Sequence, residues 1–420
     1  MAETDVITFG CRLNAVESEV MRQRARAAGL DDAVIVNTCT VTAEAVRQAR
    51  QAIRKLRRER PTARIIVTGC AAQVDPEIFA AMPEVDRVLG NREKLAPAAF
   101  APAQFARGND ARVQVSDVMA LIEPDAAAVE RFEGRTRAFV QIQQGCDHRC
   151  TFCIIPFARG PNLSLTEADL VERVRRLVAN GYAEIVLTGV DIASYGVDRG
   201  GRPALAALVR RLLADVPALQ RLRLSSLDPG TVEPALFDVF ADEPRLMPHI
   251  HWSLQAGDDT VLKRMKRRHS RAAALEACER ARAARPEIVF GADLIAGFPT
   301  ETEAMHERSV SAIAELDLTF LHVFPYSPRP GTPAGRMPQV PAAIRRERAA
   351  RLRAAGEAQL RRHLAGHVGR NADVLIEAEQ RGRAADYSPV QIDFAAPAGA
   401  VVTTRIHGAT AHELVGTRVP

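Results

Sequence analysis

The chain has 420 residues, enough for about three domains of ordinary size. Its content of 47% hydrophobic and 25% charged residues is typical of a folded globular protein and excludes a largely disordered chain. No apolar stretch is long enough to span a bilayer, and the first residues lack a basic-then-apolar signal, so we expect a cytoplasmic protein without membrane contact. Seven cysteines are too few for a disulfide scaffold, and their odd number argues against full pairing.

The first segment, to about residue 120, alternates between short apolar runs and helical stretches. The apolar runs lie at residues 5–9, 33–37, 65–68 and 85–89, and the helical stretches at 16–28, 43–59 and 76–81. Such alternation predicts parallel strands joined by crossover helices. We therefore expect an N-terminal doubly wound parallel α/β sheet over residues 1–120.

Three cysteines follow three of these predicted strands. Cys11, Cys39 and Cys70 each lie just past the carboxyl end of an apolar run. Ligands of open α/β sheets collect at that edge, so the three thiols are expected to converge on one place. Buried cysteines are also common as inert core residues, and that interpretation stays open for each cysteine alone.

Residues 118–136 are a linker candidate, and the alternation resumes from about residue 137 to 341. Strands are predicted at 138–143, 184–188, 221–225, 249–254, 289–295 and 320–326. Six such units predict a partial (β/α)6 barrel, whose reactive groups would lie at the carboxyl ends of the strands. We assign residues 132–365 to this central domain.

Cys146, Cys150 and Cys153 follow the first strand of this domain within residues 145–156, GCDHRCTFCIIP. Three closely spaced thiolates can hold three irons of a [4Fe–4S] cluster, and without a fourth cysteine nearby one iron stays open. The alternative is a zinc site of three cysteines and His148. The position of His148 between two of these cysteines is a poor one for closing a tetrahedron around one metal, which favours iron and sulfur.

The C-terminal part combines an arginine-rich helix with short apolar runs. Arginines crowd residues 344–370, and a second basic run over residues 47–60 places Arg47, Arg50, Arg54 and Arg57 on one helical face. Clusters of this kind are expected of a protein that binds a phosphate backbone, although solvated helices would look the same.

Runs at 372–376, 388–394 and 401–405 predict a small β-barrel over residues 366–420. His363 and His367 have the spacing of a metal pair, but Gly366 is expected to end the helix between them, which favours a surface role.

The motif around Cys146 resembles that of the radical S-adenosylmethionine (SAM) enzymes, and further motifs extend the resemblance to the methylthiotransferases. Those motifs are, in the order of the family, GCRLNAVES at 10–18, NTC at 37–39, TFCIIPFARG at 151–160, RLSSLDP at 223–229, HWSLQAG at 251–257, LKRM at 262–265, DLIAGFP at 293–299 and VFPYSPRPGTP at 323–333. Together they cover nearly the whole chain.

This resemblance implies two [4Fe–4S] clusters, one held by Cys146, Cys150 and Cys153 and an auxiliary one held by Cys11, Cys39 and Cys70. The first would bind SAM at its open iron and support catalysis, while the second would present sulfur. By the same resemblance, the residues expected to bind SAM are Phe152, Gly189, Asp191, Ser253, Gln255 and Gly297. The C-terminal barrel would correspond to the TRAM domain, an RNA-binding module.

Residues 185–196, IVLTGVDIASYG, resemble the subgroup that acts on N6-threonylcarbamoyladenosine beside the anticodon of tRNA. The implied partners are the tRNA anticodon stem-loop and an electron donor such as flavodoxin or ferredoxin. The alternatives are isopentenyladenosine in tRNA or an aspartate of a ribosomal protein. A catalytically silent RNA-binding iron–sulfur protein also remains open, because Leu163 and Leu165 stand where related enzymes usually carry arginines.

Overall fold

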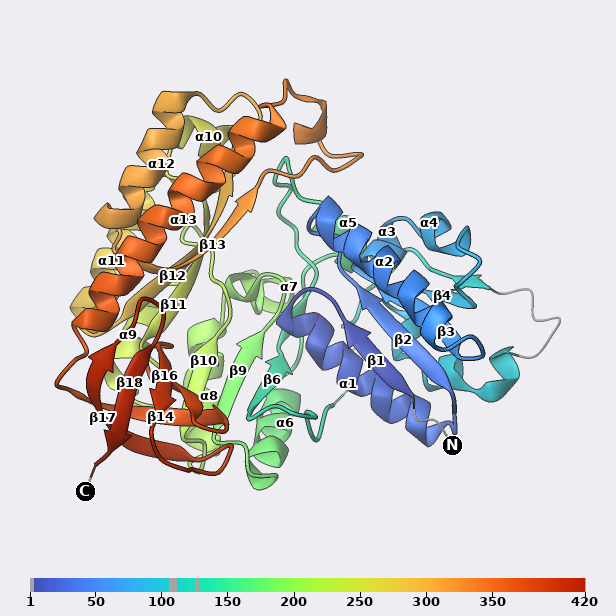
Figure 1. Cartoon of the computed structure of the whole chain (residues 1–420), viewed down its shortest axis with the longest axis horizontal. Helices are drawn as coiled ribbons and strands as arrows, with labels where there is room; N and C mark the ends of the chain where they lie inside the picture. Colours follow the sequence, from blue (N-terminus) through green and yellow to red (C-terminus); the bar gives the residue numbers. More distant parts are fainter. Residues whose placement is uncertain (1–3, 106–111, 125–127, 420) are drawn as a thin grey trace.

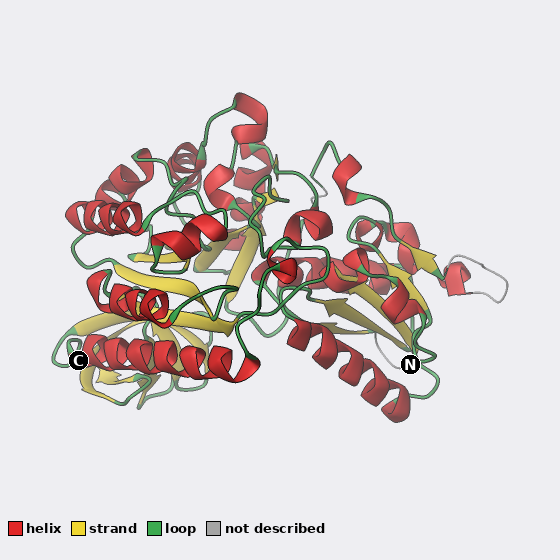
Figure 2. Cartoon of the chain, turned by 90° about the horizontal axis from the view of Figure 1, so that it is seen from above, coloured by secondary structure: helices red, strands yellow, loops and turns green. Residues whose placement is uncertain are grey.

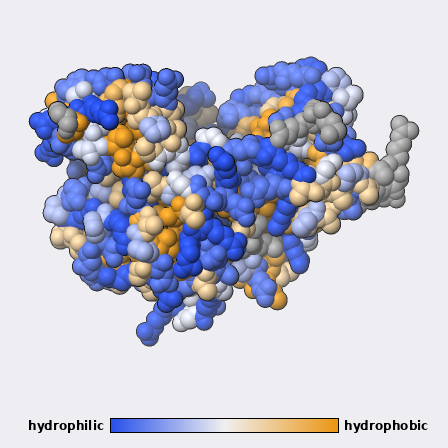
Figure 3. All heavy atoms as spheres, turned by 90° about the horizontal axis from the view of Figure 1, so that it is seen from below, coloured by the Kyte–Doolittle hydropathy of each residue, from blue (hydrophilic) through white to orange (hydrophobic). Residues whose placement is uncertain are grey.

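The structure is a computed structural model that describes residues 4–105, 112–124 and 128–419. It contains an N-terminal parallel sheet, a central set of parallel strands with outer helices, and a small C-terminal barrel (Figure 1). Figure 2 shows the N-terminal sheet beside the central strands, as Figure 1 does. In the part of the chain that is described, no helix has the length and apolar character needed to cross a membrane. The face shown in Figure 3 is mostly hydrophilic, with apolar groups scattered over it.

The N-terminal sheet has five parallel strands in the order β1-β2-β3-β4-β5. The register pairs Thr8 with Asn37 and Thr38 with Gly69, so the first three strands end at one edge. The elements are β1 (Asp5–Thr8), α1 (Arg12–Ala27), β2 (Ala33–Thr38), α2 (Ala43–Glu59), β3 (Arg64–Gly69), α3 (Cys70–Val74), α4 (Glu77–Ala80), β4 (Arg87–Leu89) and β5 (Val113–Gln114).

Helices cover both faces of this sheet. Ile35 of β2 packs in one core cluster with Met21 of α1. Its neighbours Val34 and Val36 point the other way and pack with Ile53 of α2. Because successive strand residues face opposite sides, a strand that is buried on both faces needs an unbroken apolar run, as β2 has. The predicted doubly wound α/β sheet is confirmed.

The central unit contains two three-stranded parallel sheets, β6-β9-β10 and β11-β12-β13. Isolated bridges, Leu222 to Leu246 and Leu227 to Trp252, connect the two sheets. Together they form the predicted partial barrel. Its elements are β6 (Arg137–Gln141), β7 (Gln143–Gln144), α5 (Ile155–Arg159), β8 (Leu163–Ser164), α6 (Glu167–Ala179), β9 (Glu184–Thr188), α7 (Val197–Gly200), α8 (Leu205–Asp215), β10 (Arg221–Leu224), α9 (Ala235–Asp242), β11 (His249–Gln255), α10 (Asp259–Arg264), α11 (Arg271–Ala284), β12 (Val289–Ala296), α12 (Glu303–Glu315) and β13 (Leu318–Pro325).

A long helix, α13 (Ala342–Ala365), runs from the central unit to the C-terminal barrel (Figure 1). Its Leu352 lies in the central core cluster, whereas its Leu364 lies in the core of the C-terminal barrel. One helix therefore contributes to two hydrophobic cores and ties them together. The barrel is closed, in the strand order β14-β15-β16-β18-β17, and its strands are β14 (Asn371–Ala378), β15 (Arg381–Ala384), β16 (Pro389–Ile392), β17 (Val401–Ala409) and β18 (Leu414–Arg418).

Candidate metal centres and active site

The loop that follows β6 and β7 carries the first cysteine triplet. The Cys146 N–H donates to the carbonyl oxygen of Gly160 over 3.1 Å. On the other side of the loop, the Thr151 N–H donates to the carbonyl oxygen of Met265 over 3.0 Å. The loop is thus fixed both to the end of α5 and to the segment after α10. The structure brings Cys146, Cys150 and Cys153 together on this fixed loop, close enough that their charges interact.

Gly145, directly before the first cysteine, has a backbone that other residues cannot adopt here. Its φ is +71°, and a Cβ atom would lie 1.7 Å from the carbonyl oxygen of Pro161. That distance is far below van der Waals contact, and a positive φ is strained for residues with a Cβ. Glycine at this position therefore allows the loop to approach residues 160–161.

The surroundings of the three thiols differ. Burial raises the pKa of Cys146 and raises that of Cys153 to about 11. Burial also raises the pKa of Cys150, but the His148 ring and the Arg267 charge outweigh it and leave that pKa below its usual value. Arg267 Nη1 lies 3.5 Å from the Cys150 sulfur. Cys150 is buried, and Cys146 and Cys153 are half-buried. Thiols give up their protons when a metal cation takes the proton's place, so this triplet suits metal-bound thiolates.

His148 is directed at carboxylates. Its Nε2 lies 3.2 Å from Asp191 Oδ2, and its Nδ1 lies 3.8 Å from Asp228 Oδ2. The hydrogen bond to Asp191, together with one to Cys150, raises the pKa of His148 to about 9. A ring held in this way is poorly placed to complete a zinc site with three cysteines, because zinc binds neutral imidazole.

The spacing of the sulfur atoms also discriminates between zinc and a cluster. Among the described residues, two groups bring three ligand atoms within 4.8 Å of one another, and both consist of histidine and aspartate. Neither cysteine triplet is that compact. Zinc holds all its sulfur ligands about 2.3 Å from one ion, whereas each cysteine of a [4Fe–4S] cluster binds a different iron. The wider spacing of both triplets therefore fits clusters.

The second triplet lies at the carboxyl edge of the N-terminal sheet, as predicted. Cys11 follows β1, Cys39 follows β2 and Cys70 follows β3, and the charges of the three thiols interact. Cys39 and Cys70 are buried, whereas Cys11 is exposed, and burial raises the pKa of Cys39 to about 11. A Cβ atom at Gly10 would lie 3.0 Å from the Cys39 sulfur, so the glycine makes room for that thiol.

Arg159, at the end of α5, connects the two triplets. Its Nε lies 3.1 Å from the Cys70 sulfur, and its guanidinium also donates to Asn14 and to both carboxylate oxygens of Glu17. Glu17 is shared with Lys94, whose Nζ lies 2.6 Å away. Because α5 follows the Cys146 loop directly, this buried network holds the two cysteine groups in a fixed relation. Arg159 belongs to the motif at residues 151–160, but its position in the sequence alone does not mark it as a site residue.

Phe152 is part of the Cys146 loop, and the other five predicted SAM-binding residues lie in segments that contact this loop directly or through Arg267. Phe152 packs edge-on against Phe298, next to Gly297, with ring centroids 6.4 Å apart. Asp191 contacts His148 of the loop, and Gly189 lies two residues before it. The carbonyl oxygen of Ser253 accepts a hydrogen bond of 2.6 Å from Arg267, which also reaches Cys150.

The turns that carry the predicted SAM-binding residues contain close backbone packing or a positive φ at three positions, Gly189, Gln255 and Gly297. A Cβ at Gly189 would lie 2.8 Å from Gln143 Oε1, and that oxygen accepts hydrogen bonds from the N–H groups of Val190 and Asp191. Gln255, the sixth predicted residue, ends β11 with a φ of +70°. Gly297 also has a φ of +70°, and a Cβ there would lie 2.5 Å from Arg345 of α13.

Leu163 and Leu165, which stand where related enzymes usually carry arginines, have buried side chains in this protein. Leu165 is buried in the central core cluster, and Leu163 is buried on the short strand β8. Between them, the carbonyl oxygen of Ser164 accepts a hydrogen bond of 2.6 Å from Arg199. A cation from α7 therefore lies beside this segment, which sequence reasoning could not identify because Arg199 is distant in the chain.

Ion pairs within the protein neutralise much of the charge on the two arginine-rich helices, α2 and α13. This weakens the prediction that each helix presents a free phosphate-binding face, although Arg54, Arg58 and Arg346 are exposed. The pairs include Arg47–Glu44, Arg57–Asp86, Arg348–Glu301, Arg351–Glu303 and Arg362–Asp317.

Two family models match the chain. Residues 140–313 match the radical SAM superfamily, and residues 3–90 match the uncharacterized protein family UPF0004. The fold and the Cys146 loop thus define a radical SAM enzyme, a class that works with a [4Fe–4S] cluster and SAM.

Among solved structures, the radical SAM methyltransferase TsrM from Kitasatospora setae has a TM-score of 0.55 at 16% identity, over 80% of this chain and 77% of that one. The cobalamin-dependent radical SAM enzyme OxsB has a TM-score of 0.50 at 10% identity, over 85% and 56%. These likenesses concern the fold.

Curated relatives identify the family within that class. The threonylcarbamoyladenosine tRNA methylthiotransferase MtaB of Rickettsia prowazekii is 48% identical, over 93% of this chain and 91% of the relative. MtaB of Thermotoga maritima is 35% identical over 90% and 87%. The tRNA-2-methylthio-N(6)-dimethylallyladenosine synthase of Cereibacter sphaeroides is 34% identical over 98% and 97%. The chain belongs to the radical SAM methylthiotransferase family.

Proposed function

We propose that this protein is a tRNA methylthiotransferase that converts N6-threonylcarbamoyladenosine beside the anticodon into its 2-methylthio derivative. The observation that carries the proposal is the 48% identity to the Rickettsia prowazekii MtaB over nearly the full length of both chains. The synthase of the dimethylallyladenosine group from Cereibacter sphaeroides is 34% identical over 98% of this chain, which makes isopentenyladenosine the weaker candidate. A ribosomal-protein aspartate is the remaining alternative substrate within the family.

The residues that we propose as cluster ligands are Cys146, Cys150 and Cys153 for one [4Fe–4S] cluster and Cys11, Cys39 and Cys70 for the other. When bound, the clusters and SAM would supply the radical and sulfur chemistry of the reaction. The protein's own contribution is positional. Arg159 and Glu17 fix the two triplets relative to each other. The backbone hydrogen bonds of the Cys146 loop hold the thiolates in place.

Phe152, Gly189, Asp191, Ser253, Gln255 and Gly297 are proposed to line the SAM pocket. Their support is that Phe152 belongs to the Cys146 loop and that the other five lie in segments that contact this loop directly or through Arg267. A side chain at Gly189 would collide with Gln143, and one at Gly297 would collide with Arg345, so glycine lets both turns pack closely beside the proposed pocket. Asp191, held by His148, offers a carboxylate to the amino or hydroxyl groups of a ligand.

We further propose that each of the three parts of the chain has its own role. Residues 1–120 would hold the auxiliary cluster, residues 132–365 would form the radical SAM core and residues 366–420 would contact RNA. The closed five-stranded barrel supports the last assignment by its likeness to small RNA-binding barrels. A cytoplasmic location and a small electron-transfer protein such as flavodoxin or ferredoxin would complete the system.

The experiment that tests this function is mass spectrometry of nucleosides from the tRNA of a deletion strain. We expect loss of 2-methylthio-N6-threonylcarbamoyladenosine, restored by the wild-type gene but not by Cys146→Ala. Cys278→Ala is the matched control, because this buried thiol lies in the central core, away from both triplets. Loss of the isopentenyl derivative instead would assign the other tRNA substrate. An unchanged nucleoside profile together with an altered ribosomal peptide mass would assign the protein substrate.

A further inference from the structure

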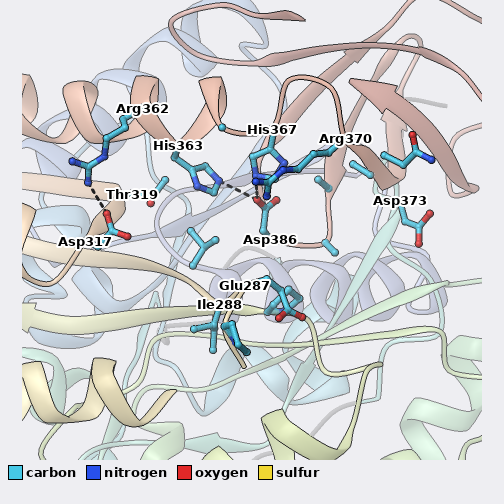
Figure 4. A pocket seen from close by; sticks show the side chains of 18 residues that line it. Glu287, Ile288, Asp317, Thr319, Arg362, His363, His367, Arg370, Asp373 and Asp386 are labelled. Carbon is cyan, nitrogen blue, oxygen red and sulfur yellow. Dashed lines mark hydrogen bonds and ion pairs between the residues drawn. The ribbon is translucent and has the colours of Figure 1, made fainter. Parts of the chain in front are cut away.

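A cavity of about 520 Å³ lies where the end of α13 meets the central strands and the C-terminal barrel (Figure 4). It is lined by residues from all three of these parts of the chain, including Thr319, His363 and Asp386. This place is remote in the fold from both cysteine triplets, because it lies at the amino ends of β12 and β13 whereas the Cys146 loop follows the carboxyl end of β6.

Two histidines and one aspartate converge in this cavity. His363 Nε2 lies 3.0 Å from Asp386 Oδ2, and His367 Nε2 lies 2.9 Å from the same oxygen. The two imidazole rings are 4.7 Å apart. Figure 4 shows both rings directed at the Asp386 carboxylate. The three ligand atoms therefore face one common point.

The carboxylate is held in place by its own turn. The Ser388 N–H donates to Asp386 Oδ1 over 3.0 Å, and the Ser388 hydroxyl lies 3.0 Å from Oδ2. Asp386 is 6% exposed, whereas the side chains of His363 and His367 are 18% and 22% exposed on the cavity side. Hydrogen bonds that orient a ligating carboxylate are a regular feature of metal sites, and the partial exposure of the rings leaves a path for an ion.

The sequence favoured a surface role for these histidines, because Gly366 was expected to end the helix between them. The helix does end at Ala365, with Gly366 as its cap. The rings nevertheless stay on the same side, and the third group comes from the turn between β15 and β16, some twenty residues further along the chain. Spacing within the helix could not reveal that partner.

We propose that His363, His367 and Asp386 bind a divalent transition-metal ion, of which Zn²⁺ fits the donor set best, and that this ion fastens the C-terminal barrel to the end of α13. Two imidazoles and one carboxylate are the ligands of many zinc sites, with the remaining position open to water or a hydroxyl such as that of Ser388. His363 Nε2 lies 3.1 Å from the Ser388 oxygen. The competing arrangement is a set of hydrogen bonds among the same side chains without metal.

The charges around the cavity permit a cation. Arg362 pairs with Asp317 over 2.8 Å, and Figure 4 shows its guanidinium turned toward that aspartate. Arg370 also lines the cavity, but so do the acids Glu287 and Asp373. Among the side chains that line the cavity, the acids thus outnumber the arginines, and the Asp386 carboxylate carries the charge that faces the ion.

The test uses the full-length protein with both clusters already loaded, so that zinc does not compete for the cysteines. The anaerobic protein is dialysed against a low concentration of Zn²⁺, and zinc and iron are measured together by plasma mass spectrometry. We expect about one zinc per wild-type chain and almost none in His363→Ala or His367→Ala, with iron unchanged in all three proteins. His407→Ala, which removes an exposed histidine of β17, is the matched control and should retain its zinc.

A second control separates the two histidine–aspartate groups. His251, Asp293 and His322 also bring three ligand atoms together, inside the central unit. Loss of zinc in His322→Ala but not in His367→Ala would overturn the proposal, as would equal zinc in the wild type and both cavity variants. If a histidine variant also loses iron, the test is thermal unfolding. The shift that Zn²⁺ causes in the unfolding temperature is then compared between the wild type and Asp386→Asn. The proposal requires a shift of several degrees in the wild type that Asp386→Asn abolishes.

Discussion

Arg159 is buried between two groups that accept its hydrogen bonds. It is 4% exposed, and it faces the Glu17 carboxylate on one side and the Cys70 sulfur on the other. The adjacent charges of Glu17 and Cys70 raise the pKa of the guanidinium well above its usual value despite burial. Breaking a buried ion pair from one side leaves the other charge uncompensated, which is among the costliest single changes.

Arg159→Met keeps the length of the side chain and removes its charge. We expect the free energy of unfolding to fall by about 3 to 5 kcal/mol. The iron content should also fall, because the charge that balances the thiolates at Cys70 is lost. Chemical unfolding and iron analysis after reconstitution measure the two effects. Arg58→Met, which removes an exposed arginine of α2, should change neither quantity. Full iron and unchanged stability in the Arg159 variant would contradict this account.

Tyr387 is expected to titrate unusually early. Burial raises its pKa, but the guanidinium groups of Arg137, Arg12 and Arg383 outweigh burial and lower the pKa to about 8. Because the folded pKa lies below the unfolded value of about 10, tyrosinate formation adds stability as the pH rises from about 8 toward 10, and adds none below 8. Ultraviolet absorbance should show a tyrosinate transition near pH 8 that Tyr387→Phe removes. Tyr195→Phe should keep it, since burial raises the pKa of Tyr195 to about 12.

At the scale of elements, the Cys146 loop depends on one glycine. Gly145→Ala would place a methyl group 1.7 Å from the Pro161 carbonyl oxygen, so the loop must move. We expect loss of about four of eight irons, because one cluster loses its preformed ligands. Gly134→Ala is the matched control: its φ of +65° is similar, but no atom lies within 4 Å of the added Cβ. That variant should cost about 1 to 2 kcal/mol of stability and keep all its iron. Equal iron in the two variants would contradict the role of Gly145.

Some elements of this fold can be predicted from the sequence, and others cannot. Strands such as β2 and β9 were predictable because strands covered on both faces are unbroken apolar runs. β15, with the sequence RGRA, and β5, with two residues, carry no such signal, because pairing with neighbours rather than their own pattern defines them. For the site, the six cysteines were predictable from spacing and strand ends. Arg159, Arg267 and Asp386 were not, since their partners lie far away in the chain.

At the scale of the whole molecule, the C-terminal barrel closes the amino end of the central strands. Arg223 of β10 donates to the carbonyl oxygens of Ala384 and Ala385 over 2.9 and 2.8 Å. It also pairs with the buried Glu184 over 2.8 Å. Tyr387, beside these carbonyls, stacks on His249 at the start of β11 with ring centroids 5.1 Å apart. The proposed RNA-binding barrel is therefore fixed to the central strands by direct contacts of Arg223 and His249.

Arg223→Met should loosen this anchorage. The half-buried Ala385 carbonyl would lose this donor, and the Ala384 carbonyl would keep the N–H of Tyr387. Glu184 would keep Arg221 and Arg137 as partners. We expect hydrogen exchange to accelerate in β14–β18 more than in β1–β3, because the change falls on the seam between the central strands and the C-terminal barrel. Arg245→Met is the control, since Arg245 caps the end of α8 through the carbonyl oxygen of Leu213, away from this seam. Equal acceleration in all parts of the chain would indicate general destabilisation, and no acceleration in β14–β18 would show that the barrel is held by its apolar contacts with α13 alone.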